Sequence, residues 1–226
     1  MWRSRAPLPC SVRGRVYDQI RNTVCYSNLN VKIAPTHAGV SVGPDGGSHQ
    51  MLEDIALMRV LPNMRVLVPA DYDACVAALK PGGGTPGPVY VRMGRASVPC
   101  VYEPGCALEI GGSRTLREGS DVTIIACGVE VNEALIAADH LAEEGIQAEV
   151  IDAYSVKPLD EAAILASAAK PVACRGEEHS VIGGLGAAVC ALLCRQKQAY
   201  AHGSGRRARP VRHFRRVRRA DAPLRS

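Results

Sequence analysis

Short apolar runs and segments with apolar residues at helical spacing follow one another along most of the chain. Runs of about four to eight apolar residues are typical of buried strands, and a recurrence roughly every three or four positions is typical of amphipathic helices. Strands that alternate with helices predict an α/β fold with mostly parallel sheets. The expected strands are 31–36, 65–68, 89–92, 122–127, 148–152 and 172–174, and the expected helices are 16–26, 51–61, 72–80, 131–144, 161–168 and 187–194.

Local signals mark several of the expected helix ends. Asp71 is suited to the N-cap position of the helix that begins at Tyr72, because its carboxylate can accept a hydrogen bond from the first turn. Gly145 is suited to close the helix before it, since a helix commonly ends on a glycine in the left-handed conformation. The run PGGGTPGP at 81–88 is expected to be a loop, because Gly and Pro both break helices.

Interruptions of this pattern divide the chain into three parts. A polar, proline-spaced stretch that ends near residue 106 is expected to link two consecutive α/β domains, residues 1–103 and residues 107–194. From residue 195 onward no apolar period remains, so residues 195–226 are expected to form a basic, disordered tail.

The charge of the chain is unevenly distributed. Its formal net charge is +5, but residues 195–226 hold eleven Lys and Arg against one Asp, which leaves 16 basic and 21 acidic residues in the rest. Arginine clusters bind phosphate backbones without sequence preference. Only Phe214 could stack on a base there, however, so a specific role in nucleic-acid binding is not expected.

Several classes of protein are disfavoured by composition. No apolar run approaches the ~20 residues that a membrane span needs, and no apolar stretch follows the basic start as it would in a secretory signal. We expect a soluble, cytoplasmic chain. The nine cysteines include no Cys-x-x-Cys pair, so they are expected to be reduced, mostly buried, and not metal ligands.

The candidate chemistry lies in the loop that follows the first expected strand. Together with the next helix and strand it forms a βαβ unit, in which ligands usually bind at the carboxyl end of the strand. This glycine-rich loop carries His37, Asp45 and His49. His49 is expected at the start of a helix, where the helix dipole disfavours a positive charge and would keep the imidazole neutral. The spacing of glycines in this loop differs from that of nucleotide-binding loops.

Each of these residues also has a purely structural interpretation. A histidine in the loop could simply cap a helix, and Asp45 lies in a sequence that forms a natural turn. Arg92, with Arg95 three residues on, leaves the end of a buried strand and could grip a phosphate or make an ordinary salt bridge. Clustered acids beside a histidine, as in Glu177, Glu178 and His179, could transfer protons, but a structural role is favoured.

Four motifs together resemble the C-terminal half of transketolase, in the form whose halves are separate chains. The similarity covers about residues 14–193, which implies a truncated pyrimidine-binding domain followed by a transketolase C-terminal domain. Before it, the first dozen residues match nothing in the family pattern, and after it the sequence diverges into the basic tail. The motifs are THAGVSVGPDGGSHQMLEDIALMRVLPNMRVLVPAD, GPVYVRMGR, DVTIIACGVEVNEALIAADHLAEEGI and EEHSVIGGLGAAV.

The resemblance implies a role for each candidate residue. His37 and His49 match the family's catalytic histidines, which line the substrate channel. Asp45 matches the aspartate that reads a hydroxyl of the donor sugar, and Arg92 matches an arginine that holds the sugar phosphate. His179 matches a motif of the C-terminal domain that is expected to be structural.

The resemblance also implies a cofactor and a partner chain. The reaction is transfer of a two-carbon ketol unit between sugar phosphates, with thiamine diphosphate bound between two subunits and Mg²⁺ as its metal ion. The family's glutamate and aromatic pocket for the aminopyrimidine have no match in this chain, and its metal site belongs to the N-terminal half. We therefore expect an N-terminal transketolase half as partner, in a homodimer or heterotetramer, and no activity without it.

Other interpretations stay open at this stage. Within the same cofactor class, a deoxyxylulose-phosphate synthase or the β-chain of an oxoacid dehydrogenase is possible, although GPDGGSHQ and YVRMGR favour transketolase. A non-catalytic fragment that dimerises through its C-terminal domain is the alternative outside enzymes.

Overall fold

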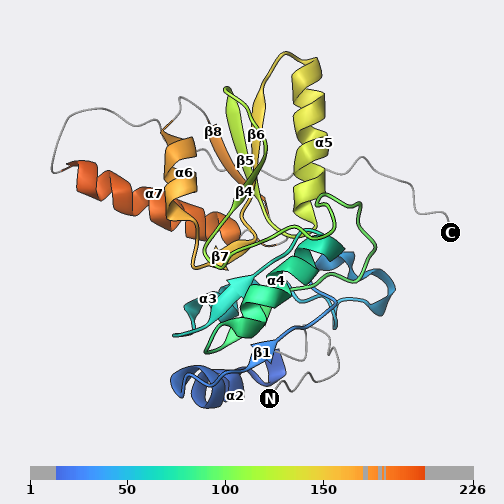
Figure 1. Cartoon of the computed structure of the whole chain (residues 1–226), viewed down its shortest axis with the longest axis vertical. Coiled ribbons are helices and arrows are strands. Elements are labelled where there is room, and N and C mark those ends of the chain that lie inside the picture. Colours follow the sequence, from blue (N-terminus) through green and yellow to red (C-terminus); the bar gives the residue numbers. More distant parts are fainter. Residues whose placement is uncertain (1–13, 170–172, 178–179, 181, 202–226) are drawn as a thin grey trace.

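The computed structural model describes residues 14–169, 173–177, 180 and 182–201, and it confirms an α/β fold (Figure 1). The helices are α2 Tyr17–Gln19, the π-helix η1 Ile20–Tyr26, the 3₁₀ segment η2 Val40–Asp45, α3 Asp54–Val60, α4 Tyr72–Gly84, α5 Glu130–Glu143, α6 Glu161–Ala168 and α7 Leu185–Ala201. The strands are β1 Lys32–Ile33, β2 Arg65–Leu67, β3 Val89–Val91, β4 Arg114–Arg117, β5 Val122–Ala126, β6 Ala148–Asp152, β7 Ser155–Lys157 and β8 Ala173–Glu177.

Two four-stranded sheets organise the chain. The first has the order β1-β3-β2-β7 and the second the order β4-β6-β5-β8. In each sheet three strands are parallel and one edge strand, β7 or β4, is antiparallel. In the second sheet, α5 stands on one side while α6 and α7 lie on the other (Figure 1). The expectation of mostly parallel sheets is thus confirmed.

Strand β7 ties the two parts of the chain together. It follows β6 of the second sheet directly but pairs with β2 of the first, where Leu67 lies opposite Ser155. Beyond this pairing, the Val68 N–H donates to the carbonyl of Tyr154 at 2.7 Å, and the Gly128 N–H donates to the carbonyl of Val68 at 3.1 Å. One buried cluster runs from Ile33 and Val66 of the first sheet to Ile125 and Ile151 of the second, so the two sheets share a core.

Helix α3 is fastened to the second half at its C-terminal end. The Arg59 guanidinium donates to the carbonyl of Gly184 at 2.8 Å and also to that of Gly183, and the Lys157 ammonium donates to the carbonyl of Arg59 at 2.8 Å. Lys157 is placed at the C-terminal end of α3, where a helix leaves carbonyls without partners within the helix. The glycines of the GGLG sequence therefore act in packing between the two halves.

The segment between the sheets is held by buried carboxylates. Asp71 caps α4 by accepting from the Ala74 N–H at 2.7 Å, as expected, and its other oxygen accepts from the backbone of Val101 and Tyr102. The Tyr102 hydroxyl in turn donates to Asp152 at 2.7 Å. Burial raises the pKa of Asp152 to about 7, with Asp71 nearby adding to the rise and the Tyr102 hydrogen bond opposing it.

The expected break at residue 81 is wrong. Helix α4 continues through Pro81 to Gly84, and the Pro81 carbonyl accepts from both the N–H and the hydroxyl of Thr85, at 3.0 and 2.7 Å. Gly82 is buried, and an added Cβ there would lie 3.6 Å from Val89 and 3.7 Å from Leu67. Packing on the sheet thus outweighs the low helix propensity of the proline and glycines.

Other boundaries shift as well. The first strand is shorter than expected, while α7 runs to Ala201, so the first seven residues of the expected disordered tail are helical and the remainder lies outside the described residues. Strands β4 and β7 were not expected, because each pairs antiparallel at a sheet edge with too few residues for a clear period. Gly145 has φ 80° and closes α5, as predicted.

The described cysteines are all free thiols, but the expectation that most are buried is wrong. Only Cys25 and Cys127 are buried, whereas Cys100 and Cys194 are exposed. Cys75, Cys106 and Cys190 lie between these extremes.

Among the described residues, no helix combines the length and apolarity that a membrane crossing requires.

The contact at Gly183 predicts a strong position-specific effect of an added methyl group. Gly183 has φ +73°, and a Cβ there would lie 2.6 Å from the Cβ of Ala56. Gly183→Ala should therefore lower the free energy of unfolding by at least about 2 kcal/mol, measured by urea denaturation. Gly186→Ala is the matched control, because a Cβ there meets nothing within 4 Å and the helix should gain up to about 1 kcal/mol. Equal effects of the two variants would contradict this packing.

Asp152 predicts how stability depends on pH. Its pKa is raised from 3.8 to about 7 in the folded chain, so folding binds a proton that the unfolded chain releases between these values. The contribution of Asp152 to the free energy of unfolding is complete below about pH 4. It is lost as the pH rises through 7, by up to about 1.4 kcal/mol per pH unit. As the pH rises across this range, the urea midpoint of the wild type should fall relative to that of Asp152→Asn. Parallel curves would show that Asp152 is not protonated in the folded chain.

Candidate functional site

The candidate loop is closed at its base by main-chain pairing. After β1, Ala38 forms a parallel bridge with Met51, and the Gly39 N–H donates to the carbonyl of Met51 at 2.9 Å. The Ala38 N–H donates to the carbonyl of Met93, just beyond β3, at 3.2 Å. Between these fixed ends the chain forms η2, which kinks at Gly43 with φ 71°. The loop therefore projects from the carboxyl edge of β1 and β3, as the βαβ pattern predicted.

His37 begins this loop in an uncommon backbone conformation. Its φ of 65° lies in the left-handed region, which costs a residue with a Cβ free energy and is concentrated at functional sites. The imidazole shares a hydrogen bond between Nδ1 and the Thr36 hydroxyl at 2.7 Å. Its other nitrogen, Nε2, lies 3.9 Å from a carboxylate oxygen of Asp45, and both side chains are about one-third exposed.

Asp45 lies between two potentially cationic groups. The same carboxylate oxygen that faces His37 is 3.6 Å from Nε of Arg95, whose side chain is 39% exposed. The Arg95 guanidinium also donates to the carbonyl of Val42 at 2.8 Å, within η2. An imidazole, a carboxylate and a guanidinium thus meet at a partly exposed surface where each can still reach a ligand.

His49 lies in the same loop but belongs to a separate turn. Its N–H donates to the carbonyl of Gly46 at 3.0 Å, and its Nδ1 shares a hydrogen bond with the Ser48 hydroxyl at 3.0 Å. The expectation that it starts a helix is wrong, because α3 begins at Asp54. The helix-dipole argument for its neutral form therefore does not apply. Over the described residues, no hydrogen bond or ion pair joins its ring to His37 or Asp45.

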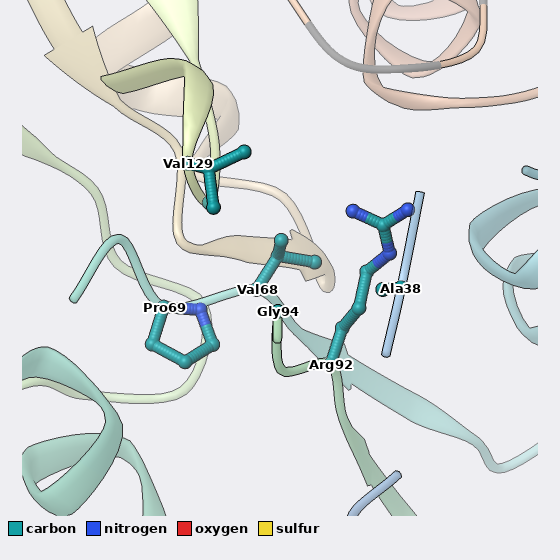
Figure 2. A pocket seen from close by; sticks show the side chains of 7 residues that line it. Ala38, Val68, Pro69, Arg92, Gly94 and Val129 are labelled. Atoms are coloured by element: carbon teal, nitrogen blue, oxygen red, sulfur yellow. The ribbon is translucent and has the colours of Figure 1, made fainter. Parts of the chain in front are cut away.

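Arg92 lies below the loop and is almost completely buried. Its Nε donates to Asp54 at 2.8 Å, and the Tyr90 hydroxyl donates to the same carboxylate oxygen at 2.8 Å. The side chain is 5% exposed. Figure 2 shows its guanidinium beside Ala38, in a small hollow between the halves that Val129 lines on the other side. Arg92 therefore presents far less surface to solvent than Arg95.

Sequence reasoning placed the loop correctly but did not select two residues. Arg95 was noted only as a neighbour of Arg92. Strand β3 ends at Val91, so Arg95 lies four residues beyond it, in the following loop. Asp54 carried a signal that could have been used, since it shares a helical stripe with the apolar Met58 and Leu61. A carboxylate on a buried stripe requires a buried partner.

The other candidates contribute no geometry to this site. Residues 178 and 179 lie outside the described part of the chain, and Glu177 is placed only as the last residue of β8. Over the described residues, no three His, Cys, Asp or Glu side chains gather closely enough to hold a metal ion. The loop itself presents an imidazole, a carboxylate and a guanidinium, which can donate and accept hydrogen bonds.

Comparison with known proteins identifies both halves of the chain. Residues 10–101 match the model of the transketolase pyrimidine binding domain, and residues 111–217 match that of the transketolase C-terminal domain. A Methanocaldococcus jannaschii protein named as a transketolase C-terminal section is 48% identical over 182 residues, 80% of this chain and 57% of that protein. The 6-deoxy-6-sulfo-D-fructose transketolase subunit of Clostridium sp. is 42% identical over 79% of this chain and 56% of its own length.

A solved structure agrees with these sequence matches. A split gene transketolase, described as an inactive beta4 tetramer, superimposes with a TM-score of 0.76 at 47% identity. The match covers 84% of this chain and 62% of that one. The chain thus spans a little over half the length of the relatives it matches.

Proposed function

Because this chain belongs to the transketolase family, we propose that it is the C-terminal subunit of a two-chain transketolase. In that role it would form one wall of a cleft in which a two-carbon ketol unit passes from a ketose phosphate to an aldose phosphate. The observation that carries the proposal is the meeting of His37, Asp45 and Arg95 at the carboxyl edge of parallel strands. Such an edge is where α/β sheets usually bind ligands.

The described residues of this chain do not supply every group that the whole cofactor needs. The family domains imply dependence on thiamine diphosphate, which when bound supplies the carbanion chemistry of ketol transfer. The described residues offer no group of metal ligands, so the Mg²⁺ and diphosphate are assigned to the N-terminal partner. This chain would contribute polar side chains that face the sugar.

Each side chain of the loop has a role that suits its surroundings. The Asp45 carboxylate would accept a hydrogen bond from a sugar hydroxyl, and the imidazoles of His37 and His49 would exchange hydrogen bonds or protons with sugar oxygens. Ser48 occupies Nδ1 of His49, which leaves Nε2 for that exchange. A guanidinium can hold a phosphate through two parallel hydrogen bonds. Arg92 and Arg95 are the candidates, and exposure favours Arg95 for direct contact.

A specific observation favours a second state for the isolated chain. The split gene transketolase structure is described as inactive and as a beta4 tetramer. We propose that this chain likewise self-associates and lacks ketol transfer activity until an N-terminal chain joins it. The cytoplasmic location expected from the composition remains a prediction, and the family resemblance implies a place in the pentose phosphate pathway.

Reconstitution tests the proposal. The full chain alone should show no ketol transfer from xylulose 5-phosphate to ribose 5-phosphate, and addition of an N-terminal transketolase chain with thiamine diphosphate and Mg²⁺ should produce it. The kcat of a complex that carries His49→Asn should be about 10²–10⁴-fold lower, the usual scale for loss of an acid–base group. Activity of the chain alone would contradict the need for a partner. A stable complex without activity would support the non-catalytic alternative.

Arg95 offers a second, more local test. In the reconstituted complex, Arg95→Gln should raise KM for a phosphorylated ketose donor by about 10–100-fold, the equivalent of one charge-assisted hydrogen bond, and leave a phosphate-free donor little changed. Arg117→Gln is the matched control, since Arg117 pairs with Asp139 on the surface of the second half. Equal losses with both donors would exclude Arg95 as the phosphate contact.

A further inference from the structure

We infer that Asp54 is a positioning residue of this site, which holds Arg92 beneath the base of the loop that carries His37, Asp45 and His49. The inference rests on the proposed function for its catalytic consequence, but its structural part can be tested without it.

The carboxylate of Asp54 is placed unusually for an acid in the first turn of a helix. It is fully buried, whereas the helix dipole would stabilise an exposed carboxylate at the same position equally well. Oδ2 accepts two hydrogen bonds at 2.8 Å, one from Nε of Arg92 and one from the Tyr90 hydroxyl. Tyr90 is the middle residue of β3 and Arg92 directly follows the strand, so one carboxylate oxygen joins α3 to β3 and to the residue beyond it.

This junction lies at the base of the loop, next to the bridge between Ala38 and Met51. The Arg92 guanidinium lies beside Ala38 (Figure 2), and Ala38 pairs with Met51 and with the carbonyl of Met93. Asp54 follows Met51 by three residues, so its carboxylate lies close in the sequence to the Met51 side of the bridge that closes the loop. The Asp54–Arg92 pair therefore links two sites. One is the segment after Met51, where the loop ends, and the other is the residue after β3, which lies beside Ala38 at the start of the loop.

A buried ion pair is a costly way to stabilise a core. Well-packed apolar side chains of similar volume often give equal or greater stability, because both charges lose their hydration. The pair at this site instead provides directional contacts, which fix the orientation of the groups they join. We therefore assign it to holding the loop in one conformation, with His37 as the first residue affected.

NMR of the full chain in its own assembly state separates positioning from simple stability. In the wild type, the Nε–H of Arg92 should exchange slowly with water, and His37 and His49 should each give one set of ring signals. Asp54→Asn should speed that exchange and broaden or double the ring signals of His37. Tyr90→Phe is the matched control, because it removes the other donor to the same oxygen and should leave both histidines unchanged.

A second variant covers the case in which Asp54→Asn does not fold. Asp54→Leu combined with Arg92→Met removes both charges together, which the general behaviour of buried ion pairs predicts to be tolerated. It should unfold cooperatively and still show altered His37 signals. Wild-type histidine signals in a folded variant would overturn the inference. Failure of both variants to fold would also overturn it, since the pair would then serve the fold itself.

Activity adds the catalytic consequence. In a reconstituted complex, the folded variant should lose about 10²-fold in kcat, the scale expected when a reacting group is misplaced by about 1 Å. Tyr90→Phe should stay within about 3-fold of wild type. If the wild-type complex is itself inactive, the proposed function fails while the NMR result still decides the role of Asp54. Perturbed His37 signals with unchanged kcat would overturn the catalytic part alone.

Discussion

The structure depends on Val68, the residue that directly follows β2, because its main chain is hydrogen-bonded to the second half of the molecule. Val68 donates its N–H to Tyr154 and accepts at its carbonyl from Gly128, so this single residue binds the segments that follow β6 and β5 of the second sheet. Backbone groups that are buried must be paired, which makes this junction specific as well as stable. It places the second half directly above the edge from which the candidate loop projects.

Buried carboxylates complete what the main chain begins. Asp71 fixes the connecting segment to α4, Asp152 receives the hydroxyl of Tyr102 from that segment, and Asp54 joins α3 to the end of β3. Burying such groups is favourable only when they are hydrogen-bonded, so each acts at a defined place and in a defined orientation. These contacts lie beneath a partly exposed group of His37, Asp45 and Arg95, which the proposed function assigns to sugar binding.

The sequence was sufficient for the fold class and for the loop, because both depend on local periodicity and on the general property of strand ends. It was insufficient where tertiary packing outweighs local propensity. Pro81 and the glycines after it are helical because Gly82 packs on the sheet, and β7 crosses to the other sheet although nothing in its three residues indicates which partner it has. The helical start assigned to His49 failed for a related reason, since the chain turns at Gly46 before α3 begins.

The prominence of Arg92 over Arg95 illustrates the same limit within the site. Both follow the same strand, but Arg92 is buried against Asp54 and Tyr90, whereas Arg95 is partly exposed beside Asp45. Exposure of this kind is a property of the folded chain and has no local sequence signal. The family resemblance, by contrast, rests on long motifs rather than on single residues, and the comparisons confirm it at the level of the family.

The central claim is that this loop forms a sugar-handling surface completed by another polypeptide. Amide hydrogen exchange measured by mass spectrometry tests it most directly, on the full chain with an N-terminal transketolase chain, thiamine diphosphate, Mg²⁺ and ribose 5-phosphate. We expect exchange to slow over residues 37–49 when the partner binds and to slow further when the sugar phosphate is added. Unchanged exchange in this loop, with protection elsewhere showing that the complex had formed, would contradict the account.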